Sequence, residues 1–533
     1  MRKEAGNAVG NDADHDAAAH GADGPSGAWT PVLRPGDTCL ALARADRVAV
    51  IVDAADYFLA VRNAMLRARR QIVMVAWDFD SRIKLDPNQP RDGVPRRLGT
   101  FLTWLVKRTP TLNIHVLKWR LSLFQAAWRG MTPLFVLDWL SDPRLNYRLA
   151  ADHPVGACHH QKIVVIDDCV AFCGGIDMTA DRWDTRAHLD HDPHRRRPSG
   201  AAYEPFHDTT MAVDGEAARM LGEIARRRWQ SATGEALPTP GDPHDVWPDG
   251  LPPLAPGPLD VAIARTQPDY DGQPQVTEIE RLWLSAIAAA RRCLYIEAQY
   301  FASRRIGQAL LRRLEEPDGP EIVVVNPQGA HGWLETHAMG LARDHMMAAL
   351  RQADPAGRRF ALYTPVTAPG RRIYVHSKVL IVDDRLIRVG SSNINNRSMG
   401  FDTECDLALE VRPGRPGADD LADAILNLRD GLVAEHLGCP VAALRGTLAE
   451  TGSLLATIER LRTRPGRTLR PLPTADVGAA GGFLVEAEIL DPERPRWPLQ
   501  GFLHRVDWDW LRRRRKARSG GTPFRVGGGA GPR

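Results

Sequence analysis

Short apolar runs alternate with amphipathic stretches along the chain, in a repeated strand–helix–strand rhythm. In the first part, strands are predicted at 48–52, 71–77 and 113–119, and helical spacing of apolar positions covers 54–70 and 98–107. The rhythm restarts later, with helices predicted over 276–291, 305–314 and 333–352 and strands over 293–297, 321–325 and 359–364. Such alternation is typical of an α/β layer architecture. The pattern therefore predicts an α/β fold with two halves of similar element order.

Composition divides the 533 residues into five segments. They are a disordered N-terminal segment (1–28), a first half (29–236), a linker rich in Pro, Gly and Asp (237–259), a second half (260–445) and a C-terminal segment (446–533). The C-terminal segment is predicted to contain a helix over 448–462 and a largely irregular tail that ends in a basic run at 512–516. That run is either a solvated tail or a contact to anionic lipid.

The two halves each carry the same motif. The first copy is His160-Gln161-Lys162, four residues and Asp167; the second is His376-Ser377-Lys378, four residues and Asp383. The four intervening residues are apolar and β-rich in both copies, at 163–166 and 379–382. Each copy is followed at the same offset by a turn of small residues, Gly174-Gly175 and Gly390-Ser391-Ser392-Asn393. This duplication predicts one active site assembled from two halves.

Strand geometry separates the roles of the motif residues. On a strand, side chains two residues apart point to the same face, so each His and its Lys point together. Each Asp lies beyond the apolar strand and is not expected to contact the same reacting atom. Asp167 and Asp383 would instead orient a ring nitrogen or anchor their motifs locally.

Two His and two Lys side chains suit the cleavage of a phosphodiester without a metal. Lys162 and Lys378 can hold the non-bridging oxygens, and the amide of Asn393 can add a donor. One neutral imidazole can attack phosphorus, and a protonated one can deliver a proton to the departing alcohol. The bare motifs are too symmetric to assign these two roles.

At these motifs the chain resembles the phospholipase D superfamily, whose signature is a duplicated His-x-Lys-x4-Asp. The flanks agree as well, with the segments at 76–81, 174–177, 182–184, 205–208, 295–301, 390–398 and 402–404. Ala298 departs from the family pattern, which usually has Asn at that position. The resemblance covers about residues 48–412 and is to bacterial and eukaryotic-type phospholipases D.

The resemblance implies two α/β-sandwich halves packed about a pseudo-two-fold, with the active site between them. It implies that His160 is the nucleophile that forms a covalent phosphohistidine and that His376 is the general acid and base. Glu404 would orient one His. The candidate catalytic residues are His160, Lys162, Asp167, His376, Lys378 and Asp383, and the candidate substrate-binding residues are Asn393, Glu404, Ser391 and Gly175.

No metal or cofactor is expected. His188, His191, His194 and His207 do not have a recognised ligand spacing. The segment around the first three resembles a mobile charged loop, and Arg195, Arg196 and Arg197 would repel a cation. The pair His207-Asp208 either lines the active site or is structural.

The resemblance implies a phospholipid-cleaving enzyme at a membrane surface. The donor would be a glycerophospholipid, and the acceptor water or a primary alcohol. A net charge of +4 gives no reason to expect nucleic acid. With no apparent signal peptide or apolar span, a cytoplasmic or peripheral membrane location is expected, and a monomer because both motifs lie in one chain. The alternatives are a cardiolipin-synthase-like transferase and a catalytically silent lipid-binding protein.

Overall fold

The computed structural model describes residues 30–87, 93–120, 142–241, 243–329, 333–473 and 491. The predicted N-terminal segment 1–28 and the basic run at 512–516 lie outside these residues. Within the described part of the chain, no helix combines the length and the apolar character needed to cross a membrane.

The first sheet is built from residues 48–214. Its strands lie in the order β2 (Val48–Val52), β9 (Thr209–Asp214), β7 (Val170–Gly174), β6 (Ile163–Ile166), β3 (Gln71–Ala76), β4 (Asn113–Trp119) and β5 (Leu145–Ala150). The β3–β4 and β4–β5 pairs are parallel, and the other pairs are antiparallel. The motif strand β6 therefore lies in the centre of the sheet.

The second sheet repeats this order with two additional edge strands. Its main path is β1 (Ala41–Ala45), β10 (Leu259–Gln267), β18 (Glu404–Glu410), β17 (Leu386–Gly390), β16 (Val379–Val382), β12 (Cys293–Glu297), β13 (Glu321–Val325), β14 (Phe360–Val366) and β19 (Thr468–Pro471), and β11 (Val276–Thr277) pairs with β10. The series β2 to β5 matches β10 to β14 strand for strand. The register matches too, since Ile72 pairs with Ile166 and Leu294 pairs with Val382. The prediction of an α/β fold with two similar halves is confirmed.

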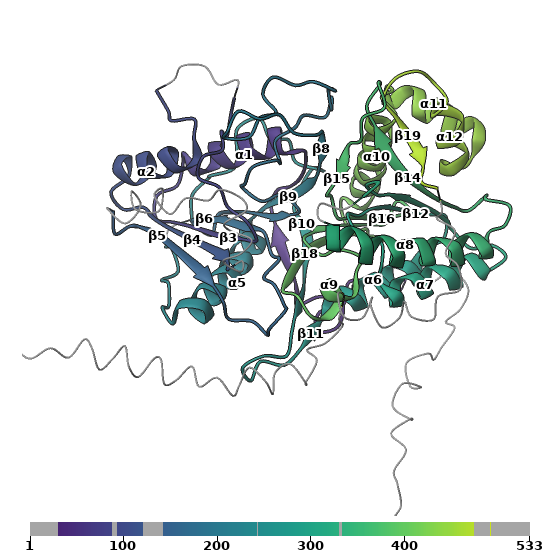
Figure 1. Cartoon of the computed structure of the whole chain (residues 1–533). Helices are drawn as coiled ribbons and strands as arrows, with labels where there is room; N and C mark the ends of the chain where they lie inside the picture. The colour runs from purple at the N-terminus through teal and green to yellow at the C-terminus, as the bar shows by residue number, and fades with distance from the viewer. Residues whose placement is uncertain are drawn as a thin grey trace, which may run out of the picture. The chain divides into compact units, whose positions relative to one another are not determined.

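Helices cover the outer face of each sheet and fill the space between the sheets. Figure 1 shows α1 (Ala54–Met65) and α2 (Leu98–Arg108) on the opposite side of the first sheet from α5 (Gly215–Thr233). It likewise shows α6 (Glu278–Ala289), α7 (Arg304–Glu315) and α8 (Trp333–Ala353) on the opposite side of the second sheet from α10 (Ala418–His436). The short helices α9 (Asn396–Gly400), α11 (Val441–Thr451) and α12 (Leu454–Leu461) complete the second half.

Alternating strand residues divide the interior into three cores. In β3, Ile72 and Met74 face α1 and α2, whereas Val73 and Val75 face the second half. The inner faces of both sheets contribute to one shared core, which includes Ile163, Val165, Val379 and Ile381. A single core across both halves fixes the two motif strands relative to each other.

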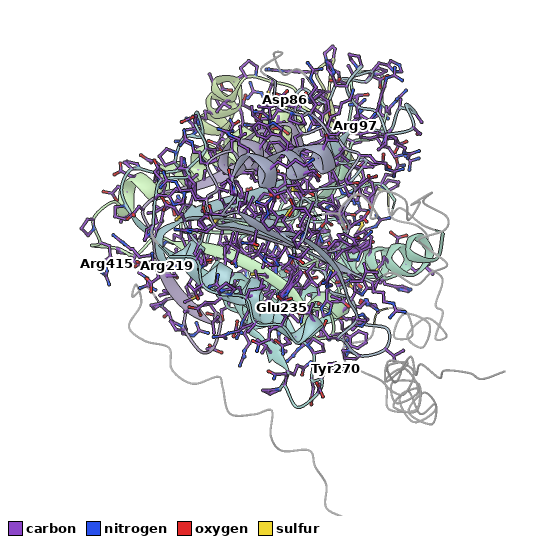
Figure 2. The ribbon with its side chains drawn as sticks, turned by 90° about the vertical axis from the view of Figure 1, so that its left-hand side faces the viewer. Asp86, Arg97, Arg219, Glu235, Tyr270 and Arg415 are labelled. Atoms are coloured by element: carbon purple, nitrogen blue, oxygen red, sulfur yellow. The ribbon has the colours of Figure 1, made fainter. Side chains whose placement is uncertain are left out.

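A short strand pair adds a direct backbone link between the halves. β8 (Phe206–His207) pairs in parallel with β15 (Tyr374–Val375), immediately before the second motif. On the first half, the connection from β3 to α2 folds back on itself through a bridge between Lys84 and Arg97. Arg97 and Asp86, which is two positions beyond Lys84, lie close together in Figure 2.

The structure departs from the sequence prediction at several places. β1 comes from the segment assigned to the first half, but it pairs with β10 in the second sheet. The helix predicted over 448–462 is two helices, α11 and α12, because Gly452 adopts φ 66° between them. The first helix ends at Met65 rather than residue 70.

Candidate active site

The two motif histidines are held by the opposite half of the molecule. The backbone N–H of His160 donates to the carbonyl of Thr403 at 2.9 Å, and that of His376 donates to the carbonyl of His207 at 2.8 Å. Each histidine lies three positions before the first residue of its own motif strand, β6 or β16. The duplicated hydrogen bonds therefore bring both motifs to the boundary between the halves.

A carboxylate from the opposite half also meets each imidazole. Nδ1 of His160 lies 3.0 Å from both carboxylate oxygens of Glu404, and Nδ1 of His376 lies 2.7 Å from Oδ2 of Asp208. Each acid directly follows the residue whose carbonyl accepts from that histidine. A proton held at Nδ1 by such a partner leaves Nε2 available to react.

Glu404 lies in a fully buried network of hydrogen-bond donors. Ser391 donates to Oε2 at 2.5 Å and Ser398 donates to Oε1 at 2.7 Å. Burial opposes the charged form, but the interactions with His160, Lys162 and Ser391 outweigh it and lower the pKa of Glu404 to about 2. Glu404 is thus a carboxylate at neutral pH, and Ser391 supports Glu404.

Asp208 and His376 form a pair of a different character. Burial raises the pKa of Asp208 to about 6. Burial, followed by the charges of Lys378 and Arg182, holds the pKa of His376 well below its ordinary value. The guanidinium of Arg182 lies 4.8 Å from the ring centroid of Phe206, which in turn lies 5.5 Å from the ring of His376. The free site therefore favours a neutral His376.

Gly175 makes room for Asp208. A Cβ atom at Gly175 would lie 2.1 Å from Oδ1 of Asp208, closer than any real contact. The predicted role of Gly175 in binding substrate has a structural alternative here, because its missing side chain allows the acid to reach His376.

The two motif lysines have different neighbours. Nζ of Lys162 donates to the carbonyl of His160 at 2.7 Å, and it lies 3.4 Å from Oδ2 of Asp177 and 5.8 Å from the ring centroid of Trp77. Nζ of Lys378 donates to Oε1 of Gln299 at 3.0 Å and to the carbonyl of His376. Burial lowers the pKa of Lys378 to about 7.

Asn393 has unused hydrogen-bonding capacity at the site. Its side chain is buried, and among the described residues its amide oxygen has no hydrogen-bond partner. By offset from the motif, Asn393 corresponds to Asp177 in the first half. The second lysine thus has a neutral amide at the position where the first has a carboxylate.

Asp167 and Asp383 lie at the far ends of the motif strands and bind backbone. The carboxylate of Asp167 accepts N–H donors from Arg69, Arg70 and Gln71, and that of Asp383 accepts from Arg291, Arg292 and Cys293, all at 2.6–2.9 Å. Of the two roles left open by the sequence, this geometry favours the local anchor. Glu404 and Asp208 are the carboxylates that contact the motif imidazoles.

Sequence reasoning did not identify Asp208 as the partner of His376. The signal was present: Glu404 begins β18, and Asp208 stands just before β9, the strand that corresponds to β18 in the duplicated order. Applying the repeat to Glu404 would have pointed to Asp208.

The segment predicted to be a mobile charged loop is partly buried. His188 and Arg195 are 1% and 2% exposed. Nη1 of Arg195 donates to both oxygens of Asp184 at 3.2 Å, and Nδ1 of His188 lies 3.1 Å from Oδ2 of the same residue. The prediction was wrong for these residues because a buried acid, Asp184, compensates their charge. His191, by contrast, is exposed.

Comparisons with known proteins bear on the family to which this chain is similar. A family model described as Phospholipase D matches residues 342–466, which include the second motif. Phospholipase D A of Dictyostelium discoideum is 25% identical over 470 residues, which cover 73% of this chain and 35% of that protein. The chain thus spans about a third of the length of that relative.

Two further proteins are similar to the chain. A cardiolipin synthase of Halalkalibacterium halodurans is 26% identical over 266 residues, covering 48% of this chain and 44% of that protein. The crystal structure of phosphatidylserine synthase from Haemophilus influenzae aligns over 74% of this chain and 88% of its own, with 13% identity and a TM-score of 0.48.

The duplicated motifs, the repeated sheet order and the similarity to proteins named phospholipase D point to one family. The family model and the relatives named phospholipase D support membership of the phospholipase D superfamily.

Proposed function

We propose that the chain is a phospholipase D-type phosphodiesterase that removes the head group of a glycerophospholipid. The observation that carries this proposal is the completeness of the site: both His–Lys sets are present, and each imidazole has a carboxylate from the opposite half. The family's metal-free mechanism needs these groups, and the relatives named phospholipase D support the substrate class.

In the first half-reaction, Nε2 of His160 attacks phosphorus while Glu404 holds the proton on Nδ1. The phosphorus–oxygen bond to the head group breaks, and protonated His376 donates its proton to the departing oxygen. A phosphatidyl group is then bound covalently to His160.

In the second half-reaction, the neutral His376 accepts a proton from water or from a primary alcohol. The oxygen attacks phosphorus, and the bond to His160 breaks. Water gives phosphatidic acid, and an alcohol gives a new phospholipid. Both imidazoles return to their starting states.

The anionic substrate explains how His376 gains its proton. Lys378 and Arg182 hold the pKa of His376 down in the free site. A bound phosphodiester carries a negative charge that offsets these cations, so its arrival favours the protonated imidazole. The same charge favours the ammonium form of Lys378, whose pKa burial lowers to about 7.

The test is incubation of the purified protein with phosphatidylcholine, with and without ethanol. We expect free choline in both samples and phosphatidylethanol only with ethanol. His160→Asn should yield neither product. Failure of the wild-type protein to release a head group from phosphatidylcholine, phosphatidylethanolamine or phosphatidylglycerol would exclude this function.

A cardiolipin-synthase-like transferase is the second candidate, favoured by the similarity to the Halalkalibacterium halodurans protein. It uses the same first half-reaction but a lipid alcohol as acceptor. Phosphatidylglycerol as sole lipid discriminates between the two: cardiolipin and glycerol indicate transfer, whereas phosphatidic acid and glycerol indicate hydrolysis.

A further inference from the structure

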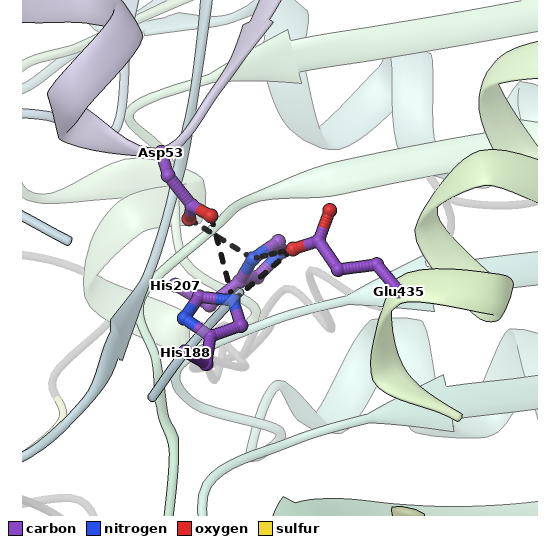
Figure 3. Close-up of side chains that lie close together, drawn as sticks. All are labelled: Asp53, His188, His207 and Glu435. Atoms are coloured by element: carbon purple, nitrogen blue, oxygen red, sulfur yellow. Dashed lines mark hydrogen bonds and ion pairs between the residues drawn. The ribbon is translucent and has the colours of Figure 1, made fainter. Parts of the chain in front are cut away.

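A second group of ionisable side chains lies buried behind the second motif, outside the reacting groups. Figure 3 shows its members: Asp53, His188, His207 and Glu435. One potential ligand atom from each lies within 4.8 Å of all the others. Their exposed fractions range from 0 to 6%. We call this group the 2-His–2-carboxylate cluster.

The cluster joins four segments of both halves. Asp53 precedes α1, His188 lies in the loop after β7, His207 is in β8, and Glu435 is in α10. No pair of these residues is closer in sequence than 19 positions, which is why no ligand spacing was recognisable. The tertiary fold alone brings them together.

Four distances between the histidine nitrogens and the carboxylate oxygens are close to the edge of a tetrahedron around a small metal ion, and the two histidines lie near different oxygens of Asp53. Nε2 of His188 lies 3.4 Å from Oδ2 of Asp53 and 3.1 Å from Oε1 of Glu435. Nδ1 of His207 lies 3.2 Å from Oδ1 of Asp53 and 3.2 Å from Oε1 of Glu435. Ligands at about 2.0 Å from a tetrahedral Zn²⁺ are separated by about 3.3 Å.

Two atoms point into the cluster without a hydrogen bond. Among the described residues, Nδ1 of His207 and Oδ2 of Asp53 have no hydrogen-bond partner, although both are fully buried. Nδ1 of His207 is close to two carboxylates but is not aligned as a donor to either. Buried polar atoms without partners are rare, and converging lone pairs are what a cation requires.

The distal nitrogens of both imidazoles are held by further acids. Nδ1 of His188 lies 3.1 Å from Oδ2 of Asp184, and Nε2 of His207 lies 2.9 Å from Oε2 of Glu297. A carboxylate behind a ligating histidine is the usual arrangement in metal sites, because it fixes the ring and its tautomer. Here it leaves Nε2 of His188, which lies 3.1 Å from Oε1 of Glu435, and Nδ1 of His207 as the ring nitrogens that face the cluster.

The net charge of the cluster and of the groups bonded to it is compatible with one bound divalent cation. Four carboxylates are present, from Asp53, Asp184, Glu297 and Glu435, and two guanidinium groups bond to them. Arg195 binds both oxygens of Asp184, including Oδ2, which faces His188. Arg186 binds Oε2 of Glu435 at 2.5 Å, the oxygen that does not face the imidazoles. The balance with neutral imidazoles is −2. It is met by one divalent ion or by two added protons.

We propose that the 2-His–2-carboxylate cluster binds one Zn²⁺ ion as a closed structural site. Two imidazole nitrogens favour zinc over calcium, which prefers oxygen ligands throughout. The ion ties α1, β8 and α10 together. His207 precedes Asp208, the partner of His376, so the site also fixes the backbone that positions the second motif. The chemical step itself uses no metal.

The direct test is the metal content of the full-length protein, produced without a polyhistidine tag. We expect about one Zn²⁺ per chain after dialysis. X-ray absorption at the zinc edge should show only nitrogen and oxygen ligands at about 2.0–2.2 Å. Zinc that dialysis removes completely, together with a denaturation midpoint unchanged by added zinc, would overturn the proposal, as would sulfur ligands.

Variants test the assignment of the ligands. Glu435→Gln keeps the size of the side chain, and Asp53→Asn suits the φ of 68° at that residue. Each should lose the bound zinc, whereas His191→Ala, an exposed histidine of the same loop, should keep it. Retention of one zinc by both ligand variants would contradict the proposal, and so would stabilisation by Ca²⁺ in place of Zn²⁺. These readouts need no substrate and are independent of the proposed activity.

Discussion

The two motifs occupy equivalent places in matching sheets, yet the residues behind them differ. Val75 of β3 pairs with Ile163, the residue after Lys162, and packs in the shared apolar core. Its counterpart is Glu297 of β12, which pairs with Val379 and accepts a hydrogen bond from Ser377 at 2.7 Å. The first motif thus rests on apolar packing, and the second rests on a buried polar network.

The same contrast extends to the lysines. Lys162 lies beside the ring of Trp77 and the carboxylate of Asp177, whereas Lys378 has the neutral Gln299 and Asn393 at the corresponding positions. Fewer compensating charges reach the second lysine, and burial lowers its pKa to about 7. The repeat preserves the backbone geometry but gives the two motifs unequal electrostatics, as unequal catalytic roles require.

The largest expected effect is on turnover, and it should distinguish variants of the two motif histidines. His160→Asn should lower turnover by at least about 10⁴-fold on any substrate, because no nucleophile remains. His376→Asn should cost about 10²–10⁴-fold with a choline head group. It should cost much less with a p-nitrophenyl phosphodiester, whose leaving group needs no proton. Steady-state rates on both substrates provide the measurement.

A direct control identifies which histidine forms the covalent bond to phosphorus. Labelled phosphate trapped on His160 in the His376→Asn variant supports the assigned order. A label on His376 in the His160→Asn variant, with none in the reciprocal experiment, would reverse the two roles.

The next largest effect on kcat should come from replacing Glu404 or Asp208, the carboxylates that contact the motif histidines from the opposite half. Glu404→Gln and Asp208→Asn each remove the acceptor that holds Nδ1–H of the facing histidine. We expect kcat to fall about 10²-fold or more in each variant, a typical loss when a general acid or base is mispositioned. Rates measured on the folded variants, verified by circular dichroism, test this.

Glu404→Gln should also lower the stability of the protein. Glu404 accepts from His160, Ser391 and Ser398, so replacing it leaves a buried network unsatisfied and should cost about 3 kcal/mol or more. Because the pKa of Glu404 is lowered to about 2, its stabilisation is present at neutral pH and is lost as the pH falls from about 4.5 toward 2. Equal denaturation midpoints for wild type and Glu404→Gln at pH 7 would contradict this.

The sequence predicted the strands and motifs well because those signals are local. The apolar run at 163–166 and the repeat at 379–382 locate both motif strands without tertiary information. Glu404 was found by resemblance, and Asp208 was missed because its contact with His376 spans 168 positions. The burial of His188 was missed although one acidic partner, Asp184, lies only four positions away, because the other, Glu435, lies 247 positions away. Charged residues in a loop are predicted to be exposed to solvent unless the acid that pairs with them in the fold is already known.

A smaller effect concerns the pH dependence of the second motif. Arg182 is one of the cations that lower the pKa of His376. Arg182→Gln removes that repulsion, so the pKa of His376 should rise. The limb of kcat/KM that requires the protonated imidazole should then move to higher pH. Arg197→Gln, which removes an exposed guanidinium paired with Asp181, is the matched control and should leave the limb in place. A shift to lower pH in Arg182→Gln would contradict the proposed cause.

The smallest effect on activity is expected at Asp167 and Asp383, where the two motifs are alike. Both residues adopt a positive φ, 52° and 53°, and both accept three backbone N–H groups. Asn tolerates this conformation but offers one neutral acceptor oxygen, so each Asp→Asn variant should lose about 1–3 kcal/mol of unfolding free energy. The two losses should be similar, and kcat should stay within about threefold of wild type, as expected for residues away from the reacting atoms. Chemical denaturation and kcat measured on the same preparations test both points. A hundredfold loss of kcat at unchanged stability would instead place that carboxylate in the chemical step. The two motifs could then no longer be described as having equivalent structural Asp residues and different catalytic surroundings.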